Sequence, residues 1–288
     1  PVEDIRPGIL AIGAFMQRRA SSLARRGGSA HSPAMLKSRV LCVIALLLAV
    51  APLRAAEEVL IVADEFPAMQ VLADQLKTQE GIASRIVKQT GMPRKLAPFK
   101  AVVVYIHRAL NAQPEKAMLD YLTNGGRLVA LHHSISSGKR TNENWFATFG
   151  VDLPKGDVTN GGYKWIEGVT IEVANLAPDQ FVTTHKVTYP NLIAPVTNAG
   201  GATAAPLPGI RFPESEVYLN HILSGERTTL LALKYTDAKT GQAWMQPTAG
   251  WTRLVGQGRL YYFMPGHSVR DFENPAYTRI VINAVIAK

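Results

Sequence analysis

The pattern of apolar and polar residues changes regularly along the first part of the folded chain. Residues 58–63 (EVLIVA) and 101–106 (AVVVYI) are unbroken apolar runs, which are typical of strands buried on both faces. Residues 68–77 and the segment from Pro114 instead space their apolar residues three or four apart, as on one face of a helix. A further run of strand type, RLVAL, covers residues 127–131. This alternation of strand and helix predicts a parallel sheet with right-handed crossovers.

The rest of the chain is less regular. We predict strands at 84–88, 164–173, 216–222, 228–235, 251–254 and 259–263, a short helix at 145–149 and a final helix at 275–286. The last two strands form a hairpin or an adjacent pair. Residues 194–213 are rich in Ala, Gly, Pro and Thr, which predicts a surface excursion.

A different pattern precedes these elements. In residues 35–56, two basic residues lead into an unbroken apolar run over 40–50, and small residues follow. This is the pattern of a secretory signal peptide, so we predict a mature domain over 57–288 in the periplasm or outside the cell, free of the membrane after cleavage. Residues 1–34 are predicted to be a disordered upstream extension that is not native to the protein. The alternative is a long basic leader from Met16.

Charge and cysteine content follow from this division. The chain has 31 Lys and Arg against 22 Asp and Glu, but eight of the former and two of the latter precede residue 57, which leaves 23 against 20. With a net charge near +3 and no basic run, we predict no nucleic-acid partner. The single cysteine, Cys42, lies in the predicted signal peptide. The mature chain would therefore have no disulfide, thiolate metal site or cysteine nucleophile.

Several polar residues directly follow predicted strands: Asp64, His107, the pair His132 and His133, and His267. Ligands of open α/β sheets bind at the carboxyl ends of the strands, so we predict one shared cleft. Asp64 could instead cap the following helix. Adjacent residues on an extended backbone point to opposite sides, so at most one histidine of the pair should face the cleft.

Carboxylates and aromatic rings could complete this cleft. Glu214 and Glu216 share one face of an extended segment, and a carboxylate beside a histidine can orient it or share acid/base work. The alternative is a solvated edge strand. Trp145 and Trp165 lie in polar, irregular surroundings where they could stack on sugar rings.

Two other chemistries receive less support from the sequence. Ser134 lies in HHSIS and lacks the glycines of a nucleophile elbow, which argues against a serine hydrolase. His132, His267 and a carboxylate could bind a divalent metal, although the chain has no HExxH or close His-x-His spacing.

Three stretches carry a resemblance to a known family: NGGRLVALHHS at 124–134, ESEVY at 214–218, and GWTRLVGQGRLYYFMPGHSVRDFENPAYTRIVINAVI at 250–286. They resemble the ThuA-like (trehalose utilisation) family of the class I glutamine amidotransferase-like superfamily. The resemblance implies a flavodoxin-like three-layer α/β/α sandwich with a mostly parallel sheet in a single domain. It also implies chemistry on 3-keto-sugars or glycosides.

Single residues can be matched through this resemblance. His132 matches the family's strand-end histidine, Glu216 and Tyr218 its acidic-x-Tyr element, and His267 its Gly-His pair. His132 and His133 stand near the position of the amidotransferase cysteine, so glutaminase activity is not expected. Where the family has a His-Pro pair, this chain has His185-Lys186.

These observations predict an exported enzyme that hydrolyses or isomerises a glycoside or 3-keto-sugar by acid/base catalysis. The predicted catalytic residues are His132, which would transfer the proton, Glu216, which would orient it or share the proton, and His267, which would polarise the sugar oxygen. The predicted substrate-binding residues are Asp64, His133, Trp145 and Tyr218. No cofactor or metal ligand is predicted, with a divalent metal as the alternative. The alternative functions are a non-catalytic carbohydrate-binding or accessory module and a metal-dependent sugar hydrolase. The sequence does not determine the oligomeric state.

Overall fold

The computed structural model describes residues 58–194 and 205–288. The predicted signal peptide and upstream extension lie outside the described residues, as does part of the predicted excursion at 194–213. The strands are β1 (Glu58–Ala63), β2 (Ala83–Val87), β3 (Ala101–Tyr105), β4 (Arg127–Leu131), β5 (Val151–Asp152), β6 (Lys164–Asn175), β7 (Asn191–Ile193), β8 (Leu207–Leu219), β9 (Ile222–Leu223), β10 (Thr228–Thr236), β11 (Ala243–Val255) and β12 (Gly258–Phe263). The α-helices are α2 (Pro67–Glu80), α3 (Ala112–Thr123), α4 (Glu143–Phe149), α5 (Phe181–Thr184), α6 (Val269–Glu273) and α7 (Pro275–Ile286), and the 3-10 helices are η1 (Gln89–Gly91), η2 (His132–Ile135), η3 (Ser137–Lys139) and η4 (Val158–Asn160).

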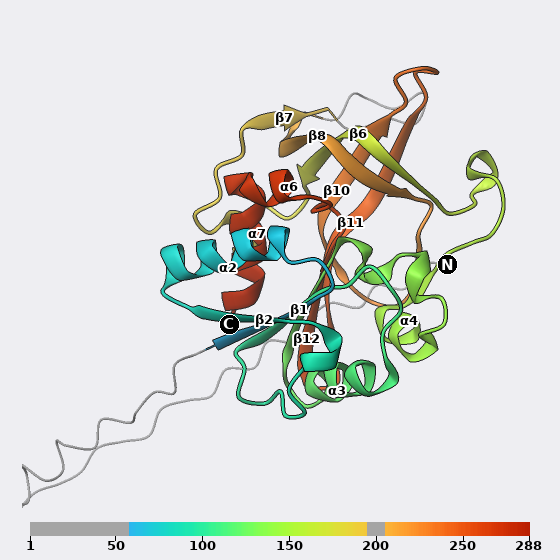
Figure 1. Ribbon diagram of the computed structural model, residues 1–288. Coiled ribbons are helices and arrows are strands. Elements are labelled where there is room, and N and C mark those ends of the chain that lie inside the picture. The colour runs from blue at the N-terminus through green and yellow to red at the C-terminus, as the bar shows by residue number, and fades with distance from the viewer. Residues whose placement is uncertain (1–57, 195–204) are drawn as a thin grey trace, which may run out of the picture. The chain divides into compact units, whose positions relative to one another are not determined.

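Ten strands form one sheet in the order β2-β1-β3-β4-β12-β11-β10-β6-β8-β7, and β5 pairs with β9 in a second, two-stranded sheet. The strands from β2 to β12 run parallel, in the lower part of Figure 1. From β12 to β7 every pairing is antiparallel, and these longer strands extend into the upper part of the same view. The large sheet therefore has a parallel half and an antiparallel half, and β12 belongs to both.

The predicted mostly parallel three-layer sandwich is wrong. Four strand pairings of the large sheet are parallel and five are antiparallel, so the sheet is mixed and mostly antiparallel, with few helices. The strand–helix rhythm holds only up to β4. Beyond it, apolar runs identify strands but carry no information on pairing direction, which tight connections such as the one between β11 and β12 decide.

The predicted surface excursion at 194–213 is also wrong where the structure describes it. Residues 207–213 belong to β8, although they include two prolines and a glycine. This end of β8 pairs with the short edge strand β7, and prolines are tolerated near a sheet edge. A Cβ at Gly209 would lie 2.3 Å from the carbonyl oxygen of Val173, so glycine is needed for close pairing there.

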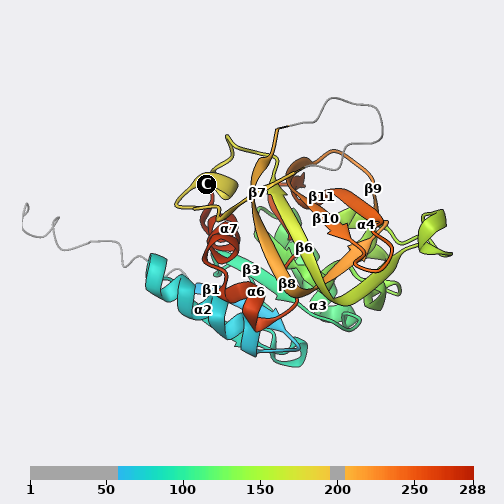
Figure 2. The same cartoon turned by 90° about the horizontal axis from the view of Figure 1, so that it is seen from above.

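The helices cover the parallel half. Helix α2 begins with Pro67, a favoured first helical residue. It ends at Glu80 and is followed by Gly81, whose φ of +68° permits the closing turn. Helices α2, α6 and α7 pack with one another, and α7 also lies against β3 and β4. Helix α3 lies against β4 and β12; Figure 2 shows this arrangement from above. Strands β1 and β3 are almost wholly buried between these elements, as their apolar sequences predict.

In the described part of the chain, no helix has the length and apolar character needed to cross a membrane.

Candidate functional site

The three side chains predicted to be catalytic come together where β4 and β12 end. Nε2 of His132 lies 3.0 Å from Oε2 of Glu216, and Nδ1 of His267 lies 2.8 Å from the same oxygen. The two ring nitrogens are 3.2 Å apart. His132 follows β4, His267 follows β12, and Glu216 is supplied by β8 from the antiparallel half. The three residues form what we call the His-Glu-His cluster.

His132 is held in an unusual backbone conformation. Its φ is +45°, a left-handed value that non-glycine residues rarely adopt and that concentrates at functional sites. The ring is fully buried, and its Nδ1 lies 2.6 Å from the carbonyl oxygen of Met264. A carbonyl can only accept, so Nδ1 carries a proton and Nε2 is the atom directed at Glu216.

Tyr218 adds a hydroxyl group to the same cluster. It lies two residues after Glu216 on β8, and therefore on the same face of the strand. Its hydroxyl is 3.2 Å from Nε2 of His132, and the two rings stack with centroids 4.8 Å apart. Burial raises the pKa of Tyr218 well above its ordinary value. The phenol therefore stays protonated and can act as a hydrogen-bond donor.

The charges in the cluster follow from these contacts. Burial alone raises the pKa of Glu216, but hydrogen bonds from His132 and His267 outweigh it and lower this pKa to about 2. The hydrogen bond to Glu216 raises the pKa of His267, against the opposing effect of burial. Near neutral pH the arrangement therefore favours an ionised Glu216 beside a protonated His267.

A cleft of about 280 Å³ opens beside the cluster. It is lined by His107, Ser136, Ser137, Gly138, Tyr163, Trp165, Glu167, Glu216 and Tyr218. Glu216 and Tyr218 thus reach the cleft wall, and His267 keeps 30% of its side chain exposed. Trp165 is 49% exposed and offers a ring face to a ligand. The described walls combine aromatic faces with hydroxyl and carboxylate groups, which is a common composition for a polar small-molecule site.

Asp64 has a local structural partner. Its carboxylate accepts hydrogen bonds from the backbone N–H groups of His107 (2.8 Å and 2.9 Å) and Arg108 (3.1 Å). It therefore closes the turn after β3 instead of lining the cleft beside Glu216. Asp64 and His107 line a neighbouring hollow of about 750 Å³ together with Lys88 and Arg108. His107 lines both this hollow and the cleft beside the cluster.

His133 packs behind the cluster and does not line the cleft. Its ring stacks on His107 with centroids 4.7 Å apart and lies 4.5 Å from the ring of Tyr105. Neither of its ring nitrogens has a hydrogen-bond partner among the described residues. Burial is the main reason why the pKa of His133 is far below its ordinary value, so the ring is neutral.

Trp145 and Ser134 are also placed in the interior. Trp145 is fully buried, stacks on Phe149 and donates from Nε1 to the carbonyl oxygen of Ser134 at 2.8 Å. The hydroxyl of Ser134 donates to the carbonyl oxygen of Val104 at 2.8 Å. Neither residue lines the cleft, and Trp165 is the tryptophan that does.

Lys139 supports the site but was not identified from the sequence. Its side chain is fully buried, and Nζ donates to the carbonyl oxygens of Ile106, His107 and His133 at 2.6 Å to 3.0 Å. Burial lowers the pKa of Lys139 to about 7. In the sequence Ser-Gly-Lys-Arg this lysine looks like part of a solvated turn, so no local pattern could have revealed it.

The cluster also offers ligand atoms for a metal ion. Glu167, Glu216 and His267 present ligand atoms within 4.8 Å of one another, and so do His132, His133 and His267. Imidazole nitrogens and carboxylate oxygens suit Zn²⁺, and the Nδ1–H of His132 on a carbonyl is a usual outer contact of a metal-bound histidine. Hydrogen bonds among the three side chains explain the short distances in the cluster equally well without a metal.

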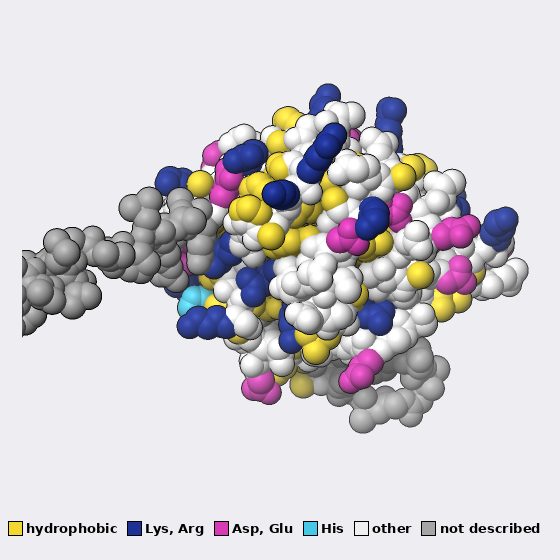
Figure 3. All heavy atoms as spheres, turned by 90° about the horizontal axis from the view of Figure 1, so that it is seen from below, with side chains coloured by type: hydrophobic (Ala, Val, Ile, Leu, Met, Phe, Trp, Pro, Cys, Tyr) yellow, Lys and Arg dark blue, Asp and Glu magenta, His cyan; other side chains and the backbone are white. Residues whose placement is uncertain are grey.

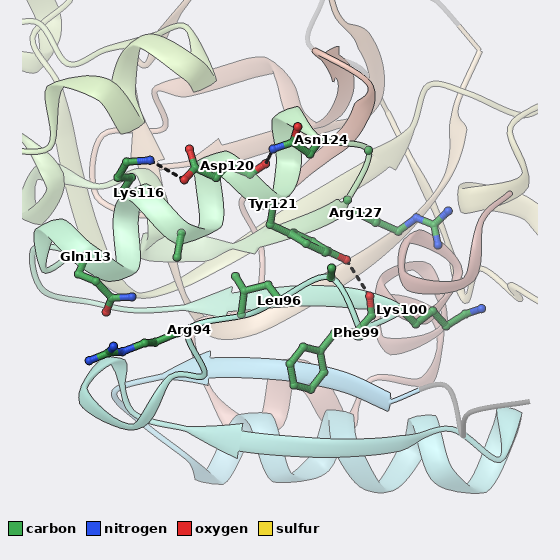
Figure 4. Close-up of a pocket in the computed structure, with 14 residues that line it drawn as sticks. Arg94, Leu96, Phe99, Lys100, Gln113, Lys116, Asp120, Tyr121, Asn124 and Arg127 are labelled. Atoms are coloured by element: carbon green, nitrogen blue, oxygen red, sulfur yellow. Dashed lines mark hydrogen bonds and ion pairs between the residues drawn. The ribbon is translucent and has the colours of Figure 1, made fainter.

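A further hollow, of about 570 Å³, lies at the opposite end of the parallel strands, where β3 and β4 begin. Figure 4 shows that Lys116 and Asp120 pair on its rim, while Tyr121 donates to the carbonyl oxygen of Phe99. Its lining includes no histidine or glutamate. It therefore lacks the acid/base groups of the His-Glu-His cluster.

Comparisons with known proteins agree with this architecture. The family model ThuA, described as trehalose utilisation, matches residues 59–286. The structure is similar to that of a ThuA-like protein from Parabacteroides merdae ATCC 43184, with a TM-score of 0.56 at 15% identity over 80% of this chain and 88% of that one. A ThuA-like protein from Bacteroides uniformis ATCC 8492 gives a TM-score of 0.55 at 16% identity over 81% and 92%. No curated protein matches. At these identities the solved structures show a shared fold.

Proposed function

The chain belongs to the ThuA (trehalose utilisation) family, and from that premise we propose that it acts on a carbohydrate in the cleft beside the His-Glu-His cluster. The proposed reaction is the hydrolysis or isomerisation of a glycoside or 3-keto-sugar by proton transfer. The observation that carries the proposal is the convergence of two imidazoles and a carboxylate within 3.2 Å of one another.

The proposed roles follow from exposure. His267 is the most exposed member of the cluster, with 30% of its side chain accessible. Its Nδ1–H faces Glu216, which raises the pKa of His267, so Nε2 of the charged ring is the atom that exchanges a proton with a sugar oxygen. Glu216 accepts the Nδ1–H, favours the charged ring of His267 and lines the cleft. His132 is fully buried; it orients Glu216 and does not touch the substrate itself. This assignment moves proton transfer from His132, where the sequence placed it, to His267.

The walls of the cleft support a carbohydrate ligand. The exposed ring of Trp165 can stack on the apolar face of a pyranose, while Ser136, Ser137 and Glu167 can hydrogen-bond to its hydroxyl groups. A volume of about 280 Å³ suits one sugar ring. The remainder of a disaccharide would extend toward the hollow beyond His107.

The test is turnover of a panel of glycosides and their 3-keto derivatives by the wild-type protein, followed by variants on the best substrate. Positioned acids and bases contribute about 10²- to 10⁴-fold in rate. We expect His267→Gln and Glu216→Gln to lower kcat/KM within that range. His185→Gln is the matched control, because His185 stacks on Phe181 away from the cleft, and it should retain full activity.

Two outcomes would overturn proton transfer by the cluster. Binding of sugars in calorimetry without product on prolonged incubation would identify a carbohydrate-binding or accessory module. Activity that disappears on chelation and returns with Zn²⁺, matched by metal in the purified protein, would identify a metal-dependent hydrolase.

We also propose that residues 35–56 export the protein. Expression from Met35 in a Gram-negative host should place the protein in the periplasm, with a mature N-terminus near residue 57, as read by N-terminal sequencing of the fractionated protein. An uncleaved protein in the cytoplasmic fraction would contradict export.

A further inference from the structure

We infer that Asp271 is a positioning residue that holds Glu216 and His267 in register with each other. Asp271 is 1% exposed on the short helix α6 and was not identified from the sequence. The inference goes beyond the proposed reaction. Its geometric part stands by itself, whereas its effect on turnover depends on the proposed function.

One carboxylate oxygen makes the connection. Oδ2 of Asp271 accepts a hydrogen bond from the backbone N–H of His267 at 2.7 Å and another from the hydroxyl of Ser215 at 2.7 Å. Ser215 is fully buried and immediately precedes Glu216 on β8. The same oxygen thus ties the turn that carries His267 to the strand that carries Glu216.

Regular sheet pairing does not fix this part of β8. The register between β6 and β8 shifts between Glu167 and Val169, opposite Glu216 and Ser215. Glu214 next to them has a φ of +55°. Because a bulge disrupts the ladder locally, the strand needs another contact to define where Glu216 lies. The Ser215–Asp271 hydrogen bond supplies that contact.

The turn carrying His267 is held at several points. The hydroxyl of Tyr105 donates to the carbonyl oxygen of His267 at 2.7 Å, and the hydroxyl of Tyr277 donates to the carbonyl oxygen of Pro265. Gly266 has a φ of +109°, and a Cβ there would lie 2.6 Å from that Tyr277 hydroxyl. These contacts fix the backbone of the turn, so the N–H of His267 points toward the carboxylate of Asp271.

The energetics favour a positioning role. Oδ1 of Asp271 is buried and has no hydrogen-bond partner among the described residues. A buried carboxylate with an unsatisfied oxygen destabilises a fold relative to an apolar side chain of similar size. We therefore attribute the presence of Asp271 to the two groups that it aligns, Ser215 and the backbone of His267. Hydrogen bonds to a charged acceptor are stronger than those between neutral groups.

Charged and titratable groups from every neighbouring element surround His267. They are Glu216 on β8, Glu167 on β6, His132 and His133 on η2, and Asp271 on α6. Glu216 makes the direct contact, and the charge of Asp271 also raises the pKa of His267. The protonation of His267 therefore reports the alignment of Glu216 where Asp271 is retained, as in Ser215→Ala.

The test uses Ser215→Ala, which removes only the link to the strand, and Asp271→Asn, which keeps the shape and removes the charge. Thr252→Val is the matched control, because Thr252 is a buried hydroxyl on β11 that bonds to a backbone carbonyl. The pKa of the His267 ring is measured by NMR on histidine-labelled full-length protein, with the signal assigned from His267→Gln. Thermal midpoints are measured alongside.

We expect Ser215→Ala and Asp271→Asn to lower the pKa of His267, while Thr252→Val lowers only the thermal midpoint. On a substrate of the wild-type protein, the first two should lower kcat about 10- to 100-fold with KM within about twofold, since small misplacements of reacting groups cost that much. An unchanged pKa in Ser215→Ala would overturn the inference, because this variant breaks the link to β8 and keeps the charge of Asp271. Because the NMR measurement needs no substrate, it decides this even if the proposed reaction fails.

Discussion

At the scale of single residues, the site depends on one carboxylate between two imidazoles. Hydrogen bonds from His132 and His267 lower the pKa of Glu216 to about 2 against the effect of burial, and the hydrogen bond to Glu216 raises the pKa of His267. Such coupling makes protein stability depend on pH. The stabilisation requires Glu216 to be ionised and His267 to be protonated at the same time.

The pH dependence can be stated with its sign. The contribution of Glu216 is fully present above its ordinary pKa of 4.5 and is lost as pH falls toward about 2. The contribution of His267 is fully present below its ordinary pKa of 6.5 and is lost as pH rises through its raised pKa. Compared with Glu216→Gln, the wild-type protein should be most stabilised between these two ordinary values, on the order of 3 kcal/mol.

Urea unfolding of both proteins across the pH range measures this difference. Glu226→Gln is the control, because Glu226 is exposed, and its difference from wild type should stay flat. A Glu216→Gln difference that keeps growing above neutral pH would contradict the mutual stabilisation.

The sequence could identify some of these residues but not their contacts. His132 and His267 each follow a strand, and that position alone predicted where they would meet. Asp271 and Lys139 are different, because each is defined by distant partners. The partners of Asp271 are Ser215 and the backbone of His267, and those of Lys139 are carbonyl oxygens at the ends of other elements. No local sequence pattern encodes such partners.

At the scale of elements, the close approach of α3 to β12 depends on glycine. A Cβ at Gly258, the first residue of β12, would lie 1.8 Å from the carbonyl oxygen of Leu122 and 2.5 Å from that of Gly126. Both contacts are to backbone atoms, which cannot rotate away. Helix α3 and the start of β4 would have to move.

Gly258→Ala should therefore destabilise the protein by about 1–3 kcal/mol, as overpacking does, and lower the thermal midpoint by about 2–10 °C. Gly91→Ala is the control, because its added Cβ would meet its nearest neighbour, Val87 Cβ, at 3.9 Å. Differential scanning fluorimetry of the two variants checks the prediction. Equal thermal midpoints for the two variants would show that α3 can move away from β12 without loss of stability.

At the scale of the whole molecule, charge is spread over the surface. Figure 3 shows one face on which Lys and Arg side chains lie among acidic, apolar and uncharged ones. Residues 57–288 have 23 basic and 20 acidic side chains, which provides little attraction for a phosphate backbone.

A protein of residues 57–288 should accordingly leave a labelled DNA duplex unshifted at micromolar concentration in about 150 mM salt. The full chain is the informative comparison, since residues 1–56 add eight basic and two acidic side chains. Gel-shift titration measures both. Salt-sensitive micromolar binding by the shorter protein would contradict the prediction.

The fold as a whole could be predicted from the sequence only in part. The rhythm of apolar runs and helical stripes located β1, α2, β3, α3 and β4 because parallel strands buried on both faces are continuously apolar. Strands β6, β8, β10 and β11 were each located in part, whereas β7 was not predicted and β9 was not separated from β8. Their antiparallel pairing depends on connections and on a bulged register that apolar patterning does not encode.

The His-Glu-His cluster joins the two halves of the large sheet: both imidazoles follow parallel strands, and the carboxylate comes from an antiparallel one. Neither half alone contains a complete set of reactive groups. Local fraying of β8 would move Glu216 away from the two imidazoles while most of the chain stayed folded. In the proposed reaction, turnover should therefore be lost at a lower denaturant concentration than the cooperative transition seen by circular dichroism.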